Sequence, residues 1–399
     1  MNSKLVTYTD KNLSSNKSIW LFTLAIILFA TTLRTPLTVV GPIISFIRDG
    51  LGISNVLAGF LTTIPLLAFA AVSPFAARIA RKFGMEWTLF YSVIILCMGV
   101  ALRSVGSTSL LIFGTILIGV AIAFGNVLIP SYFKLKFPLH IGLLTGIYSV
   151  SMNISAGLAA GLSYPIASIS GWQLALGLSL ILGILTLLFW LPILKDRKVE
   201  MNFASSNKPK KKMWKSPLAW AIAATMGLQS LIFYCSSAWL PDIFISQGMD
   251  AQAAGWMGSI MQLAQIPLTF VVPIIAGKLS SQRPIVLFFS ICYIIGFTGV
   301  LMEWTSLAVL WMMFLGFAGG ASFSLVLMFF TLRTETAFEA ADLSGFAQSV
   351  GYLVAAIGPV LFGYVHDATN SWTIPVLLFL IASVLLFTAS FISAKKQFV

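Results

Sequence analysis

Charged residues are scarce in this sequence. Asp, Glu, Lys and Arg make up 9% of the 399 residues, and hydrophobic residues make up 58%. Soluble globular proteins carry roughly 25% charged residues, because their surfaces must be solvated. This lack of charge excludes an ordinary soluble domain and predicts a protein surrounded by lipid.

Groups that bind metals or act as nucleophiles are scarce as well. The three cysteines lie far apart in separate apolar runs, and the two histidines lie near the ends of different predicted helices. The sequence has no HExxH motif, no His/Asp cluster and no nucleophile elbow. We therefore expect no metal, no cofactor and no enzymatic activity. A membrane-embedded enzyme, which would need such a constellation at the membrane interface, is the remote alternative.

Long uncharged runs are what the sequence has instead. A helix needs about 20 residues to span a hydrocarbon core ~30 Å thick. The gaps between charges provide twelve such helices, in residues 18–47, 51–77, 87–102, 104–133, 141–194 (two helices, with a turn at Ser170-Gly171), 216–240, 251–277, 284–302, 304–332, 343–365 and 368–394. The predicted fold class is an all-α membrane protein with twelve transmembrane helices.

Basic residues predict how these helices are oriented. If the N-terminus is cytoplasmic, all but three of the 24 Lys and Arg fall in the tails and loops on the cytoplasmic side. The exceptions are Arg34 within the membrane and Arg48 and Arg103 outside. This distribution satisfies the positive-inside rule and predicts a multi-pass protein of the cytoplasmic membrane with both termini inside. The net charge of +12 then indicates topology and attraction to anionic membrane lipid, and we expect no nucleic-acid partner.

The chain divides into two similar halves. A polar, lysine-rich segment at residues 195–215 separates six predicted helices at 18–194 from six at 216–394, with cytoplasmic tails at 1–17 and 395–399. The sequence AGFL at residues 58–61 is echoed by AGWM at 254–257, and Thr145-Gly146 by Ser344-Gly345, at offsets of 196 and 199 residues. Two six-helix pseudo-repeat bundles are the plan of a major facilitator transporter.

A basic loop supports that interpretation. Arg78, Arg81 and Lys82 precede Gly84 in a segment similar to the cytoplasmic motif of major facilitators, G-x-x-x-D-R-x-G-R-K/R. The resemblance implies that these three residues help to close the inward gate. The aspartate of the motif is missing, since Ala77 stands before Arg78, and a basic loop that only satisfies topology is the alternative.

Further segments resemble the cyanate and 2-nitroimidazole transporter branch of the major facilitator superfamily. They are LRTPLT at residues 33–38 with Gly41-Pro42, GNVLIP at 125–130, YSVSMN at 148–153, GLQS at 227–230 with WLP at 239–241, and LSG at 343–345 with QSVGY at 348–352. The resemblance covers both halves. It implies a carrier of small, often planar or anionic solutes, with helices one, four, five, seven and eleven around the cavity.

Arg34 is the charged residue that interrupts the first apolar run. An arginine at the centre of a membrane helix costs at least ~2.5 kcal/mol. All twelve acids lie in loops or at helix ends, so no membrane-centre carboxylate is available to offset that cost. We predict that Arg34 binds an anionic or strongly accepting solute. A structural ion pair or a bond to a backbone carbonyl is the alternative.

Other polar side chains occur at membrane depth. An unpaired amide in lipid costs several kcal/mol, so these groups must face other helices or a wet cavity. The candidate substrate-binding residues that join Arg34 are Asn126, Tyr148, Asn153, Gln229, Tyr234, Gln262, Gln265, Gln348 and Tyr352. For each amide, hydrogen bonding that only holds helices together is the alternative.

These observations predict a monomeric secondary transporter that moves a small, anionic or planar polar solute by alternating access. Multidrug or nitroheterocycle efflux is the competing function. Carriers of cationic drugs usually place an acid in the cavity, and this sequence offers a cation. Proton relays also need an ionisable group within the span. We therefore expect that any proton coupling does not use a membrane-centre carboxylate, with Asp242 the nearest exception.

Overall fold

The computed structural model describes residues 16–194 and 212–399, and these residues form helices and short connections without a strand. Twelve helical segments within the described residues are long and apolar enough to cross a membrane, which confirms the predicted fold class. The elements are α2 (Asn16–Thr38), η1 (Gly41–Ile43), α3 (Ile44–Leu51), α4 (Asn55–Phe83), α5 (Met85–Arg103), α6 (Thr108–Lys136), α7 (Ile141–Ser170), α8 (Trp172–Gly177), α9 (Ser179–Trp190), η3 (Met213–Lys215), α10 (Pro217–Ser246), α11 (Ala251–Lys278), α12 (Arg283–Leu301), η4 (Thr305–Leu307), α13 (Ala308–Leu332), α14 (Ala337–Thr369) and α15 (Thr373–Ser393).

The first span is broken near its C-terminal end. Helix α2 ends at Thr38, and the chain continues through η1, which has a proline in its first turn, into α3. Proline has no N–H to donate, so it is tolerated at the start of a helix and ends the one before it. Gly52 then closes α3 in the left-handed conformation, at φ 63°.

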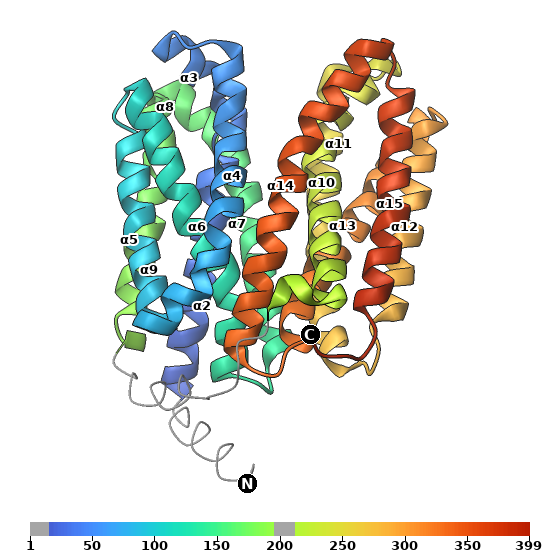
Figure 1. The fold of residues 1–399 in the computed structure, drawn as a ribbon. Helices are drawn as coiled ribbons and strands as arrows, with labels where there is room; N and C mark the ends of the chain where they lie inside the picture. Colours follow the sequence, from blue (N-terminus) through green and yellow to red (C-terminus); the bar gives the residue numbers. More distant parts are fainter. Residues whose placement is uncertain (1–15, 195–211) are drawn as a thin grey trace.

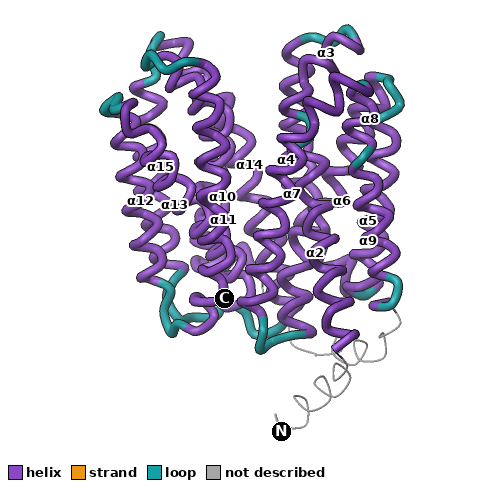
Figure 2. Tube along the Cα trace, turned by 180° about the vertical axis from the view of Figure 1, so that it is seen from behind, coloured by secondary structure: helices purple, strands orange, loops and turns teal. Residues whose placement is uncertain are grey.

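The helices form two groups. Helices α2 to α9 pack mainly on one another, and so do α10 to α15, while α4 and α6 contact α14 and α7 contacts α11 across the groups. Figure 1 shows the two groups side by side, close together at the lower end, where the C-terminus lies, and diverging toward the upper end. Figure 2 shows the same arrangement from behind. The predicted linker at 195–215 and the tail at 1–17 fall mostly outside the described residues.

Two equivalent glycines bring the groups into close contact. A Cβ atom on Gly345 would lie 2.5 Å from the carbonyl oxygen of Ser73, and one on Gly146 would lie 2.9 Å from the carbonyl oxygen of Phe270. Gly345 joins α14 to α4, and Gly146 joins α7 to α11. The sequence repeat pairs these glycines, which explains why a small residue recurs at this spacing. Each lets two backbones approach closely without a side chain between them.

Two arginines at the ends of helices are buried. Arg103, which the charge count assigns to the outer side of the membrane, is only 1% exposed, and its Nη1 donates to the carbonyl oxygen of Pro36 over 2.7 Å. It therefore places a cation at the C-terminal end of α2, where the helix dipole favours one. Arg333, just beyond α13, donates from Nε to the Ser393 carbonyl oxygen over 2.8 Å. Burial lowers the pKa of Arg333 to about 10, which leaves it protonated at neutral pH.

Candidate functional site

Arg34 lies between the two groups of helices. It projects from the last turns of α2 over the rings of Phe233 in α10 and Phe323 in α13, with its Cζ atom 5.6 and 5.4 Å from the ring centroids. Its side chain is half-buried. Among the described residues, no hydrogen bond or ion pair to the guanidinium occurs. The aromatic faces thus attract the cation without neutralising it or occupying its N–H donors.

Two pockets meet at this arginine. Both are lined by Arg34, Tyr234, Phe323 and Tyr352. The first pocket is also lined by Leu33, Leu37, Phe69, Asn126, Tyr148, Met152, Met226, Leu327 and Gln348. The second is also lined by Asn153, Gln229, Ser230, Phe233, Gln265 and Gly319. Residues from both groups of helices therefore contribute to each pocket.

The structure brings most of the predicted substrate-binding residues together. All of them except Gln262 line one or both pockets. Gln262 lines neither pocket, and its Oε1 accepts a hydrogen bond from Gln265 Nε2 over 3.2 Å. Their roles in substrate binding stay predictions.

The apolar lining was not predicted. Phe233, Phe323 and Met152 are apolar residues of uncharged runs, where a side chain that faces a pocket and one that faces lipid look the same in the sequence. Helical spacing could have found two of them. Phe233 is four residues after Gln229, and Met152 is four residues after Tyr148, so each shares a helix face with a predicted polar residue.

Several polar side chains at the pockets also join helices. Tyr148 donates to Asn126 Oδ1 over 3.4 Å, and Asn153 Nδ2 donates to Thr269 Oγ1 over 3.1 Å, from α7 to α11. Gln348 Nε2 donates to the main-chain oxygen of Asn126 over 3.0 Å, from α14 to α6. These amides therefore join helices and line the pockets as well.

A family model matches most of this chain. The model of the Major Facilitator Superfamily matches residues 19–359. The chain belongs to the major facilitator superfamily. It is accordingly a multi-pass membrane protein and a secondary transporter of small solutes, and not an enzyme.

Relatives narrow the branch. The chain is 44% identical to the uncharacterized transporter YycB of Bacillus subtilis over 389 residues, which cover 96% of this chain and 95% of that protein. It is 39% identical to the 2-nitroimidazole transporter of Escherichia coli, over 90% of this chain and 92% of that protein. The cyanate transport protein CynX of Escherichia coli is 23% identical, over 88% and 91% of the two chains. The predicted cyanate and 2-nitroimidazole branch is confirmed.

A solved structure supports the same fold. The proton:xylose symporter XylE, bound to 6-bromo-6-deoxy-D-glucose, superposes with a TM-score of 0.78 at 13% sequence identity. The match covers 94% of this chain and 95% of that chain. At this identity the likeness concerns the fold, which is that of a major facilitator.

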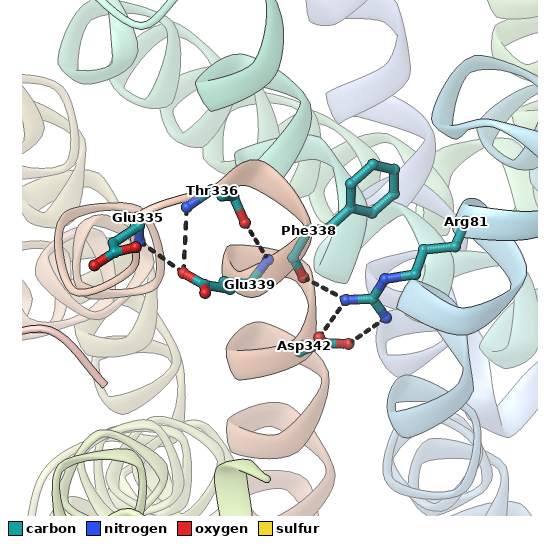
Figure 3. Close-up of polar contacts among 6 residues, drawn as sticks. All are labelled: Arg81, Glu335, Thr336, Phe338, Glu339 and Asp342. Atoms are coloured by element: carbon teal, nitrogen blue, oxygen red, sulfur yellow. Dashed lines mark hydrogen bonds and ion pairs between the residues drawn. The ribbon is translucent and has the colours of Figure 1, made fainter. Parts of the chain in front are cut away.

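One of the three predicted gating residues of this major facilitator reaches the other group of helices. Arg81 in α4 binds both carboxylate oxygens of Asp342 in α14, with a distance of 2.8 Å from Nη1 to Oδ1, and Nη2 donates to the Phe338 carbonyl oxygen over 3.3 Å. Figure 3 shows this fork beside the start of α14, which Thr336 and Glu339 cap. The cytoplasmic motif of the family lacks its aspartate here, and Asp342 supplies a carboxylate from the other half.

The other two predicted gating residues are exposed. Arg78 lies over the Phe75 ring at 5.9 Å, and Lys82 lies over the Phe83 ring at 5.2 Å, so each contacts its own helix. A lysine that was not predicted to act in gating contacts the other group of helices instead. Lys134, near the end of α6, donates to the Thr331 carbonyl oxygen over 2.7 Å and to Thr334.

No cluster of metal ligands occurs in the part of the chain that the structure describes. No group of three or more His, Cys, Asp or Glu side chains comes together there. The free cysteines Cys97, Cys235 and Cys292 lie in separate helices, α5, α10 and α12.

Proposed function

We propose that this major facilitator carries a small, planar polar solute whose anionic or strongly accepting oxygen group binds Arg34. The observation that carries the proposal is the guanidinium itself, which lies where two pockets meet and has neither a hydrogen-bond acceptor nor a counter-ion among the described residues. A charge at membrane depth is costly unless a partner compensates it. A solute that brings negative charge or acceptor atoms would supply that partner.

The surroundings of Arg34 favour a flat ligand. Its N–H donors lie in the plane of the guanidinium, and Phe233 and Phe323 lie near it from the second group of helices. A planar fork of donors matches planar oxygen acceptors better than a lysine ammonium would. The names of the relatives agree, because 2-nitroimidazole carries a nitro group and cyanate is a small anion.

The pockets give no support to the competing function of cationic drug efflux. Carriers of cationic drugs usually place a carboxylate in the cavity. The residues that line the two pockets include one arginine and no acid. We therefore assign the carrier to anionic or acceptor-bearing solutes.

Alternating access is proposed to move the two groups, residues 18–194 and 216–394, against each other. Arg34 belongs to the first group, and Phe233 and Phe323 belong to the second, so a solute held at Arg34 is bound between the moving parts. The bonds of Arg81 to Asp342 and of Lys134 to the end of α13 would hold the end near the C-terminus shut. We propose that this end faces the cytoplasm and that the monomer works in the cytoplasmic membrane, with its basic loops toward anionic lipid.

Binding measurements on Arg34 variants test the proposal. Purified wild-type protein, Arg34→Lys and Arg34→Gln are titrated with 2-nitroimidazole, cyanate, nitrate and 4-hydroxybenzoate by isothermal titration calorimetry. We expect the wild type to bind at least one of them, Arg34→Lys to lose roughly tenfold in affinity, and Arg34→Gln to lose roughly a hundredfold, since charge-assisted bidentate bonds are the strong ones.

A matched control is available in the same half. Arg48 is a partly exposed arginine paired with Asp49, outside the pockets, so Arg48→Gln should bind like the wild type. Gel filtration must show each variant as a single species. Affinity of Arg34→Gln equal to that of the wild type would make Arg34 structural and end the case for an acceptor-binding site.

A further inference from the structure

The orientation of the Gln348 amide is fixed by its partner. Gln348 Nε2 lies 3.0 Å from the main-chain oxygen of Asn126. A carbonyl oxygen can only accept, so the nitrogen of the amide must face it. This carbonyl has no partner within α6, because Pro130, four residues later, has no N–H to bond to it.

The same nitrogen has no donor left for a solute. Its second N–H reaches Ser344 Oγ at 2.8 Å, so both hydrogens of Gln348 Nε2 are bound within the protein. The side chain is 1% exposed and lines the first pocket. Among the described residues, its Oε1 atom has no hydrogen-bond partner. The polar atom that Gln348 can offer to a solute is therefore an acceptor.

A similar constraint applies to Asn153 in the second pocket. Thr269 Oγ1 donates its hydrogen to the Gln265 carbonyl oxygen over 2.6 Å, so it can only accept from Asn153 Nδ2 at 3.1 Å. The Oδ1 atom of Asn153 is then left as an acceptor. Each pocket thus combines the donors of Arg34 with an amide oxygen of fixed orientation.

We propose that Gln348 determines specificity by accepting a hydrogen bond from the solute, so that the carrier selects solutes with an N–H or O–H donor as well as the acceptor group held by Arg34. This rests on the function proposed above for Arg34. Nitrate and cyanate have no donor at neutral pH, and binding them would leave the buried Oε1 atom of Gln348 without a partner. A site built to bond a donor discriminates strongly against an analogue without it.

Matched ligands test this selectivity. Dissociation constants are measured for 2-nitroimidazole, 1-methyl-2-nitroimidazole and 4-methyl-2-nitroimidazole, at a pH where the ring N–H is protonated, and for nitrate and cyanate. The 1-methyl compound lacks the donor, and the 4-methyl compound adds the same bulk but keeps it. A second pair, 4-hydroxybenzoate and 4-methoxybenzoate, repeats the comparison with an O–H donor. We expect the donor-bearing member of at least one pair to bind at least tenfold more tightly.

Variants assign the effect to Gln348. Gln348→Met, which keeps the length of the side chain and removes the acceptor, should lower affinity for the donor-bearing compound about tenfold and remove the preference. Ser349→Ala is the control, because Ser349 is the next residue of α14 and donates to the Ala70 carbonyl oxygen outside the pockets. Ser349→Ala should keep the wild-type preference for the donor-bearing compound.

The outcomes separate this inference from the proposed function. Equal binding of the compounds with and without the donor, in both pairs, would overturn the inference, and so would tighter binding of nitrate or cyanate. An unchanged preference in Gln348→Met, or failure of every donor-bearing compound to bind, would overturn it as well. If Arg34→Gln still abolishes binding in those cases, the function proposed for Arg34 stands. Unchanged binding by Arg34→Gln would remove both.

Discussion

Ser349 of α14 donates a hydrogen bond to the main-chain oxygen of Ala70 in α4, across 2.7 Å. In a regular helix that oxygen would accept from residue 74, but Pro74 has no N–H. The adjacent residue Gln348 has the same relation to Asn126, whose carbonyl Pro130 leaves free. Two prolines in the first group of helices therefore create acceptors that consecutive residues of α14 fill from the second group.

Removing the Ser349 hydroxyl should weaken the contact between α4 and α14. A lost neutral hydrogen bond costs about 1 kcal/mol, so we expect Ser349→Ala to shift the balance roughly fivefold toward conformations in which this interface is open. Spin labels at Phe83 and Leu279, both exposed at the end near the C-terminus, report the change by double electron–electron resonance. Ser383→Ala is the control, because Ser383 bonds within its own helix, to the Phe379 carbonyl oxygen.

The same measurement in a Pro74→Ala background tests whether the proline makes the Ser349 bond necessary. Alanine restores the N–H, so the carbonyl of Ala70 gains a partner within α4. Ser349→Ala should then shift the distance distribution less than it does in the wild type, because neighbouring effects of this kind are not additive. An equal shift in both backgrounds would show that the proline and the serine act independently.

The helices and the polar part of the site could be predicted from the sequence, because both follow from the cost of placing polar groups in lipid. Charges mark the loops, and Arg34 and Gln348 stand out inside apolar runs. Gln262 and Gln265 show the limit of this reasoning. They lie three residues apart on one helix, and only the rotation of α11 decides that Gln265 lines the pocket.

Apolar and long-range partners could not be predicted in this way. Phe233 and Phe323 have the composition of lipid-facing residues, and their place beside Arg34 depends on how the two groups pack. The partner of Arg81 lies 261 residues away in the chain. A proline does identify the carbonyl that it leaves free, four residues before it, but the residue that fills this acceptor depends on tertiary contact.

The pair formed by Arg81 and Asp342 should stabilise the closed end of the interface. Both side chains are about one quarter exposed, and the contact is bidentate, so we expect a coupling of about 1–2 kcal/mol in a double-mutant cycle. Arg81→Gln and Asp342→Asn should each shift the spin-label distances toward the open interface, and the double variant should add little. Arg78→Gln, at an exposed residue that contacts its own helix, should leave the distances unchanged. Additive shifts would mean that the pair contributes no coupling.

The orientation in the membrane is tested by labelling single cysteines. In a background without Cys97, Cys235 and Cys292, cysteines at Ser107 and Ser371 should react with an impermeant maleimide added to intact cells. Ser107 precedes α6 and Ser371 precedes α15, in connections that the positive-inside rule assigns to the outside. A cysteine at Ser206, which lies outside the described residues, should react only after the cells are opened. Labelling of Ser206 in intact cells would reverse the proposed topology.

Proton coupling, if present, should not depend on a carboxylate at the membrane centre. Neither pocket is lined by an acid, and Asp242, the nearest candidate, is exposed near the C-terminal end of α10. We therefore expect Asp242→Asn, reconstituted in liposomes, to take up 2-nitroimidazole under an imposed pH gradient at a rate within about twofold of the wild type, as surface substitutions usually have small effects. Arg34→Gln, measured alongside, should lose both gradient-driven uptake and solute exchange. A variant Asp242→Asn that keeps exchange but no longer responds to the gradient would identify this carboxylate as a proton carrier, because exchange requires binding and alternating access but no net proton transfer.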